Sequence, residues 1–414
     1  MKFSCKNQLN LVHVLISVAI VGMWFYTCRR MTIFGDDLSL QHAAFSVEWL
    51  INRYYHWSSR LLIESVWVPL VQVKWLLQTL NFLVLVATPV GFYLLFRQIK
   101  LDFKQAICLS AVLPLWTMYS AGWGATIVNY WYTPLACVFA LYFLTLDHLK
   151  LWQIFLFVVL LLFGVNQELN AIAMLGTLIL MLWQYKRTPY IWAALVLVLL
   201  SIAFELTAPG NHARFLSEIR TWLPAYAGYS LPYKAYIGIM HTMSFHLFAL
   251  NVCFAFIASA IVFLKTRKVA FACAAVIVFC GLQFVSSKVI GGMNGIAPFD
   301  GAFRAKHGLA LLLVIVEFGF LLWCVLRSEI TVKAKILILS GCALAIAVPS
   351  SMGFSPTVWA SSDRVFLPGD FMLIGFGILI YHHAKITRDD LWKVIYFCLL
   401  FGGPRLARLS ITAF

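Results

Sequence analysis

The 414-residue sequence is poor in charge, and above all in negative charge. Charged residues make up 11% of the chain, with 16 Asp and Glu against 31 Lys and Arg, whereas a soluble domain carries about 25%. Hydrophobic residues make up 62%. This composition excludes a soluble enzyme and a DNA-binding domain. Lys and Arg occur in twos and threes between apolar runs, so the net charge of +15 does not predict a nucleic-acid partner.

Common sequence motifs of soluble enzymes are also missing. The chain has no P-loop, GxGxxG, HExxH or GxSxG motif, and its ten cysteines include no CxxC pair and no Cys/His cluster. Nearly all of these cysteines fall inside apolar runs, where they serve as small buried side chains. We therefore predict no disulfide framework and no zinc site. No internal repeat is visible either.

Long apolar runs are abundant, and their length is that of membrane-spanning helices, which need about 20 residues. We predict an all-α integral membrane protein in which one polytopic domain, 1–414, has about 12–13 transmembrane helices. The predicted spans are 10–28, 75–96, 105–121, 131–147, 151–165, 169–184, 189–206, 235–264, 269–285, 309–326, 335–350 and 365–383. A shorter run at 391–403 would make the thirteenth. The first run has no small-residue cleavage site and is interpreted as an uncleaved span.

The distribution of charge predicts the orientation. With a cytoplasmic N-terminus, the short segments on that side carry basic clusters such as Arg97, Lys100 and Lys104, as cytoplasmic loops do. The other side has longer loops that hold most of the acids and many aromatics. These outer loops are 30–74, 207–234, 286–308 and 351–364. Because functional residues concentrate in loops on a rigid scaffold, we expect the active face on this outer side.

The first outer loop, 30–74, is the most informative segment. Asp36 and Asp37 follow the first span, and apolar residues then recur at helical spacing over 38–54. This pattern predicts an amphipathic helix on the membrane surface, followed by a second short helix over about 59–72. A carboxylate at this boundary can take the proton from an acceptor hydroxyl. Asp36 and Asp37 are therefore the catalytic candidates, and a helix cap or a solvated loop is the alternative.

Other outer segments supply polar candidates of two kinds. Arginine binds phosphate well, so we expect the cationic group to bind donor phosphate or lipid: Arg60, Arg214, Arg304, Lys306 and Arg364. The second group consists of candidates for sugar or acceptor contacts: Asn129, Tyr130, Trp131, Glu168, Asn211 and His212. Each candidate has a structural alternative, such as an aromatic belt, a buried hydrogen-bond network, a snorkelling arginine or an internal ion pair.

These residues resemble those of a known class. Gly35-Asp36-Asp37-Leu38, with Arg60 downstream, is similar to the first outer loop of polytopic bacterial glycosyltransferases of the GT-C type, which carries one or two acids and surface helices. The other similar patches are NYWYTP (129–134), NQEL (166–169), APGNHAR (208–214) and SSDR (361–364). In size and layout most of the chain resembles O-antigen-modifying glucosyltransferases, which include phage-encoded serotype-converting enzymes.

The resemblance implies a function at the periplasmic face of the bacterial inner membrane. The donor would be an undecaprenyl-phosphate-linked hexose, with glucose as the first candidate. The acceptor would be a lipid-linked polysaccharide such as O-antigen. Asp36 or Asp37 would act as the general base that takes the proton from the acceptor hydroxyl. A flippase and a donor-synthesising glycosyltransferase would be functional partners, alongside membrane lipids. The cofactor stays open, because some enzymes of the class use Mg²⁺ or Mn²⁺ and others use no metal.

A lipid-linked sugar flippase or another polytopic transporter is the alternative function. Transporters often have inverted repeats and charges near the middle of the membrane. This sequence has no visible repeat, and Glu317 is the acid that lies clearly near the middle of a predicted span. A non-catalytic membrane partner is a third hypothesis.

Overall fold

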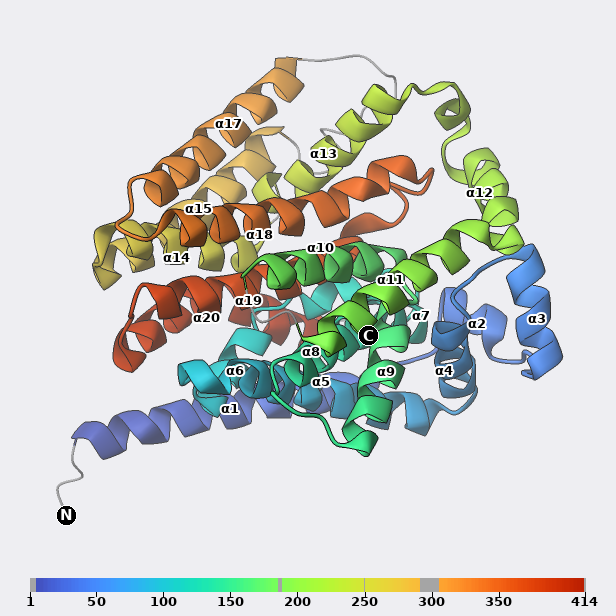
Figure 1. The fold of residues 1–414 in the computed structure, drawn as a ribbon, viewed down its shortest axis with the longest axis horizontal. Coiled ribbons are helices and arrows are strands. Elements are labelled where there is room, and N and C mark those ends of the chain that lie inside the picture. The colour runs from blue at the N-terminus through green and yellow to red at the C-terminus, as the bar shows by residue number, and fades with distance from the viewer. Residues whose placement is uncertain (1–4, 185–187, 249, 291–304, 413–414) are drawn as a thin grey trace.

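The computed structural model describes residues 5–184, 188–248, 250–290 and 305–412, and every regular element within these ranges is a helix (Figure 1). The α-helices of the first half are α1 (Cys5–Arg30), α2 (Asp36–Leu40), α3 (Val47–His56), α4 (Leu61–Gln72), α5 (Lys74–Phe96), α6 (Phe103–Ser110), α7 (Trp123–Ile127), α8 (Thr133–Leu144), α9 (Leu151–Val165) and α10 (Glu168–Gln184). Those of the second half are α11 (Pro189–Thr207), α12 (Pro209–Trp222), α13 (Leu231–Phe248), α14 (Val252–Thr266), α15 (Val269–Ile290), α17 (Ala305–Leu326), α18 (Val332–Ser350), α19 (Leu367–His383) and α20 (Arg388–Thr412).

Short 3₁₀ and π-helical segments lie between the α-helices of the described residues. The 3₁₀ segments are η1 (Arg97–Ile99), η2 (Leu115–Tyr119), η4 (Pro224–Gly228), η5 (Ser351–Phe354) and η6 (Ser362–Phe366), and η3 (Val128–Tyr132) is a π-helical turn. The predicted outer loops 207–234 and 351–364 therefore contain α12, η4, η5 and η6. Much of the predicted loop 286–308 lies outside the described residues.

The structure confirms an all-α polytopic membrane protein. Within the described ranges, seven helical stretches are long and apolar enough to cross a membrane. They are Asn10–Arg30, Lys74–Ile99, Trp123–Leu144, Pro189–Thr207, Val269–Ser287, Val332–Phe354 and Ser362–His383. Five shorter apolar helices accompany them, including α9 and α10 at the predicted positions. The total of about 12–13 crossings stays a prediction.

Two of the predicted spans are broken in the structure. The predicted span 105–121 is not one helix, because α6 ends at Ser110 and a 3₁₀ turn begins after Pro114, whose ring cannot continue a helix. The predicted span 235–264 is two helices, α13 and α14. The side chain of Asn251 accepts a hydrogen bond from the backbone N–H of Phe254 and so caps a new helix.

Asn129, Tyr130 and Trp131 were expected in an outer segment, and this expectation was wrong because the chain is helical from Trp123 onward. α7, the π-helical turn η3 and α8 form one continuous rod to Leu144. Pro134 has no backbone N–H to donate and its ring would collide with the carbonyl four residues earlier. A π-helical turn at 128–132 is a known way for a helix to absorb such a local fault, and such turns occur often at functional sites.

The first outer loop folds into three short helices instead of two. The predicted helix over 38–54 is divided into α2 and α3, because the side chain of Ser46 accepts a hydrogen bond from the N–H of Trp49 and starts α3 anew. The second predicted helix corresponds to α4. Figure 1 places α2, α3, α4 and α12 together at one end of the bundle, and α12 packs against α3. This end contains most of the predicted site residues.

The main core joins side chains from both halves of the chain around α14. α14 is buried from Val252 to Leu264 and packs against α15 and α19. Leucine, isoleucine and phenylalanine side chains remain exposed on the outer helices, as on α11 and α17. A bundle with a buried centre and an apolar outside suits a lipid environment, where the hydrophobic exterior needs no polar cover.

Candidate functional site

A polar cleft of about 280 Å³ lies where α2, α3 and α4 meet α7, η3, α12 and η6. Six predicted site residues from five separate segments of the chain line it: Asp36, Arg60, Asn129, Tyr130, Arg214 and Arg364. Their sequence separation is large, so this convergence is a property of the tertiary fold.

Asp36 and Asp37 have opposite environments. The side chain of Asp36 is exposed at the cleft and has no hydrogen-bond or ion-pair partner among the described residues. Its backbone N–H donates to the carbonyl of Ala121 at 2.8 Å, which holds the residue in place. Asp36 is therefore the carboxylate that a substrate can reach.

Asp37 is fully buried and serves as an anchor. Its carboxylate accepts hydrogen bonds from the backbone N–H groups of Gly124 and Ala125, at 2.8 and 2.7 Å, and from the indole N–H of Trp67 at 2.8 Å. The two backbone donors belong to the first turn of α7, where the helix dipole favours a negative charge. Burial raises the pKa of Asp37, and the three hydrogen bonds act in the opposite direction. Asp37 ties α2 to α4 and α7 and does not line the cleft, so its role is structural.

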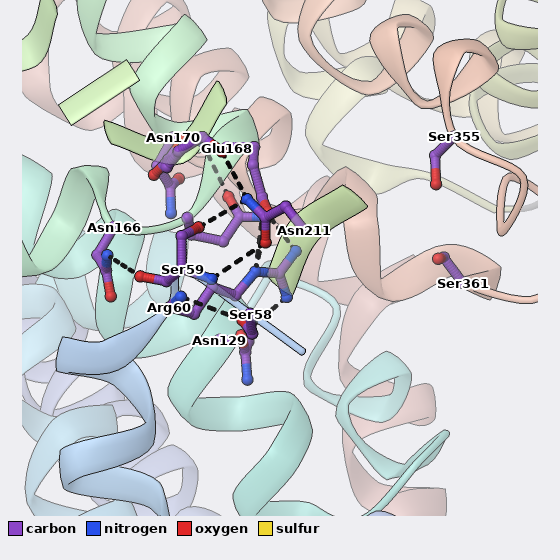
Figure 2. Close-up of polar contacts among 12 residues, drawn as sticks. Ser58, Ser59, Arg60, Asn129, Asn166, Glu168, Asn170, Asn211, Ser355 and Ser361 are labelled. Carbon is purple, nitrogen blue, oxygen red and sulfur yellow. Dashed lines mark hydrogen bonds and ion pairs between the residues drawn. The ribbon is translucent and has the colours of Figure 1, made fainter. Parts of the chain in front are cut away.

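Arg60 is the central cation of the site (Figure 2). Its Nε donates to the carboxylate of Glu168 at 3.0 Å, and its Nη1 donates to Asn129 Oδ1 at 3.1 Å. Burial alone would lower the pKa of Arg60, but the Glu168 carboxylate outweighs it and raises the pKa above its usual value. Arg60 therefore stays charged at any physiological pH. Glu168 does not line the cleft itself and acts on it through Arg60.

A hydrogen-bond network positions the turn that carries Arg60. Asn211 Oδ1 accepts from the backbone N–H of Ser59 at 3.0 Å, and Asn211 Nδ2 donates to the Ser59 hydroxyl at 2.9 Å. Asn166 Nδ2 donates to the Ser59 carbonyl at 3.1 Å. Figure 2 shows both amides converging on this turn, with Ser355 and Ser361 well apart from it. Asn211 was predicted to contact sugar, and the structure gives it this positioning role instead.

Gly210 lets α12 approach this turn closely. A Cβ at position 210 would lie 2.5 Å from the carbonyl oxygen of Tyr54 and 2.6 Å from the backbone nitrogen of Trp57. Backbone atoms cannot move aside as a flexible side chain can, so Gly210→Ala is expected to destabilise the protein by about 1–3 kcal/mol. Thermal unfolding in detergent measures this. Gly228→Ala is the matched control, because a Cβ there meets nothing within 4 Å; equal melting temperatures for the two variants would refute the close packing.

Two further arginines of the cleft are held by carboxylates that the sequence did not single out. Arg53 forms a two-pronged salt bridge with Glu64, with both N–O distances 2.8 Å. Arg214 Nε lies 2.9 Å from Glu218, one turn along α12. The helical spacing i, i+4 of the second pair was visible in the sequence. The first pair joins α3 to α4 and could not be read from spacing.

Arg364 differs from the other three arginines of the cleft. It donates to the Ser120 hydroxyl at 3.1 Å and lies over the ring of Tyr130, with 6.0 Å from the guanidinium carbon to the ring centre. Among the described residues it forms no salt bridge, and its Nε is buried without a partner. Arg364 is thus the cleft arginine with hydrogen-bonding capacity left for an anionic ligand.

Several predicted residues lie elsewhere. Trp131 is fully buried, and its indole N–H donates to the Thr88 hydroxyl at 2.9 Å, so the expected sugar contact was wrong. His212 is exposed on α12 and does not line the cleft. Arg304 and the side chain of Lys306 lie outside the described residues.

The donor groups of the cleft do not suit a divalent metal. Its carboxylates are Asp36, Glu64 and Glu218, and arginines hold the latter two. Among the described residues no group of three His, Cys, Asp or Glu side chains could bind a metal ion. We therefore assign no step of a reaction to a metal.

Comparison with known proteins gives no relative: no protein-family model, no curated protein and no solved structure matches this chain. Any functional assignment rests on the residues of the cleft and on the resemblance of the short motifs.

Proposed function

We propose that the protein transfers a hexose, with glucose as the first candidate, from an undecaprenyl-phosphate carrier to a lipid-linked polysaccharide such as O-antigen. The observation that carries the proposal is the pairing, in one cleft beside the membrane, of an accessible carboxylate with arginines. Asp36 supplies the carboxylate, and Arg364 supplies an anion-binding group without a salt bridge among the described residues.

In the proposed reaction Asp36 acts as the general base. Its carboxylate takes the proton of an acceptor hydroxyl as the oxygen attacks the anomeric carbon of the donor. The bond between that carbon and the phosphate oxygen breaks, and the phosphate leaves with the electron pair as undecaprenyl phosphate. The step balances in atoms and charge. A glycosidic bond forms as the bond to the phosphate oxygen breaks, Asp36 takes the proton, and the phosphate gains the negative charge that Asp36 loses.

The leaving phosphate needs cationic partners, and the proposal assigns them to the arginines of the cleft. Charge-assisted hydrogen bonds to phosphate are about twice as strong as neutral ones. Arg364 would bind first, because its donors are least occupied. Arg214 would exchange part of its contact with Glu218, whereas Arg60 would remain on Glu168 and Asn129 and hold the shape of the cleft.

The proposal places the protein in the bacterial inner membrane with the N-terminus in the cytoplasm and the cleft at the periplasmic face. The basic short segments and the position of Asp36 directly after α1 support this orientation. Undecaprenyl-phosphate donors made on the cytoplasmic side would then have to be flipped, which is why a donor synthase and a flippase are the expected partners.

An in vitro assay with purified protein, undecaprenyl-phosphate glucose and a lipid-linked O-antigen acceptor tests the reaction. The expected result is acceptor-dependent formation of a glucosylated lipid-linked glycan. Other undecaprenyl-phosphate hexoses serve as a second donor set. If no donor gives product while the protein moves the donor across a vesicle membrane, the proposal fails and the flippase alternative replaces it.

The assignment of Arg364 has its own test. Arg364→Met keeps the apolar stem of the side chain and removes its guanidinium group, and a hydrogen bond to a charged group is worth about 1.5–3 kcal/mol. We expect kcat/KM for the donor to fall by roughly 10–100-fold, mainly through a higher KM. Arg220→Met is the control, because Arg220 is exposed on α12 and does not line the cleft. A donor KM unchanged by Arg364→Met would reject the phosphate contact.

A further inference from the structure

Trp57 is an aromatic side chain of the cleft that the reaction proposed above does not use. It directly follows α3, lines the cleft and is 39% exposed. The guanidinium carbon of Arg53 lies 5.5 Å from the centre of its ring, so Arg53 covers one face of the indole. The indole N–H has no hydrogen-bond partner in the part of the chain that the structure describes. An aromatic face and a hydrogen-bond donor are therefore available to a ligand.

The backbone at Trp57 is fixed by its own helix and by α12. Its N–H donates to the carbonyl of Arg53 at 2.8 Å. From α12, Gly210 packs so closely that a Cβ there would lie 2.6 Å from the Trp57 nitrogen. Asn211 then binds Ser59, two residues beyond Trp57 (Figure 2). Trp57 is thus positioned before any ligand binds, which lowers the entropic cost of binding.

The charged side chains next to Trp57 cancel one another. Arg53 pairs with Glu64 at 2.8 Å, and Arg214 pairs with Glu218 at 2.9 Å. We call Trp57 and these four side chains the Trp57 wall. The second carboxylate oxygen of Glu218 accepts no hydrogen bond from a described residue. The Trp57 wall can therefore accept hydrogen bonds from hydroxyl groups, but it has no excess of positive charge for a further anion.

Asp36 and Arg364 are held by a different segment. Arg364 donates to the Ser120 hydroxyl at 3.1 Å, and the backbone N–H of Asp36 donates to the carbonyl of the next residue, Ala121. The two contacts attach the proposed base and the proposed phosphate-binding arginine to one turn of the chain. The Trp57 wall is formed instead by α3, α4 and α12, and it is left for the sugar of the other substrate.

We propose that the Trp57 wall binds the acceptor sugar and that this sugar is a neutral hexopyranose. One face of a pyranose ring carries C–H bonds, and the face of an aromatic ring is electronegative, so the two stack. Hydroxyl groups at the edge of the sugar donate to Glu218 and accept from the indole N–H of Trp57. A hexuronic acid would instead bring its carboxylate beside Glu64 and Glu218. The assignment to the acceptor rests on the proposed transfer reaction, whereas the binding of a sugar does not.

The first test measures glycan binding to the purified full chain without donor, by NMR titration. The probes are a neutral O-antigen oligosaccharide released from its lipid and an oligosaccharide of the same length with one hexuronic acid. Wild-type protein should bind the neutral glycan at least about tenfold more tightly, a difference of 1.4 kcal/mol. Trp57→Leu should weaken this binding by about the same factor, and Trp57→Phe, which keeps an aromatic face, should weaken it less. Trp222→Leu is the matched control, because Trp222 is exposed on α12 and does not line the cleft.

The second test separates the two substrates in the transfer assay. Trp57→Leu should raise the acceptor KM about tenfold and leave the donor KM unchanged, the reverse of Arg364→Met. A rise of both KM values by the same factor would indicate a merely structural role for Trp57 and overturn the proposal.

Two results of the binding test would also overturn the proposal. The first is a wild-type protein that binds no neutral glycan, or binds the acidic one equally well, and it requires no variant. The second is unchanged affinity in Trp57→Leu. If the wild type binds the glycan through Trp57 but transfers no hexose, the sugar site stands and the transfer reaction is refuted, so the two failures are distinguishable.

Discussion

Asp36→Asn is expected to lower the rate of hexose transfer by about 10²–10⁴-fold, the usual contribution of a general base. The amide cannot accept the proton of the acceptor hydroxyl, so the attacking oxygen stays a weak nucleophile. The side chain makes no hydrogen bond among the described residues, so the amount of folded protein should not change. The measurement is the initial rate of glycan transfer at saturating donor, with protein level determined in the same membranes.

Glu48→Gln is the matched control for this prediction. Glu48 is an exposed acid on α3 in the same outer loop, and it does not line the cleft. Its substitution removes one negative charge from the same face and should leave transfer at the wild-type rate. Full transfer by Asp36→Asn would contradict the role of general base and leave the cleft without an accessible carboxylate for it.

Asp37→Ala is expected to destabilise the protein by at least about 3 kcal/mol, because three buried donors lose their acceptor and each costs about 1–3 kcal/mol. These donors are the N–H groups of Gly124, Ala125 and Trp67. The first turn of α7 would lose its anchor to α2 and α4. The expected signs are a lower melting temperature in detergent and less folded protein in the membrane.

Asp37→Asn separates structure from chemistry at this position. The amide keeps one oxygen for two of the donors but turns an N–H toward the third, so its destabilisation should be smaller than that of Asp37→Ala. Folded Asp37→Asn protein should retain most of its transfer rate, in contrast to Asp36→Asn. A folded Asp37→Asn protein without activity would instead assign Asp37 to the reaction.

Asp36 and Asp37 show how much of the site can be predicted from the sequence. Their position after the first span and before a helix made both of them catalytic candidates, with a helix cap as the alternative role. Which one does which depends on α7, whose N–H groups lie 87 and 88 residues further along the chain. Local spacing carries no information on such a contact, so the roles could be separated only in three dimensions.

The aromatic and basic candidates show the same limit. The sequence grouped Asn129, Tyr130 and Trp131 as one patch in a loop, but they belong to a π-helical turn. Consecutive residues of a helix point in different directions, so Asn129 and Tyr130 reach the cleft while Trp131 turns into the core. Arg53 could not be found in advance, because its partner Glu64 is on a different helix.

Composition and hydrophobic periodicity alone determined the all-α membrane class and the positions of most helices, with helical segments within 30–74 among them. These features are local, because the cost of exposing backbone polar groups to lipid forces each apolar segment into a helix regardless of its neighbours. Only the tertiary structure decided where helices break, which acid is accessible and which arginine has donors to spare. Those properties depend on contacts between distant segments, in which a buried charge must find its partner, and no local pattern records where that partner will be.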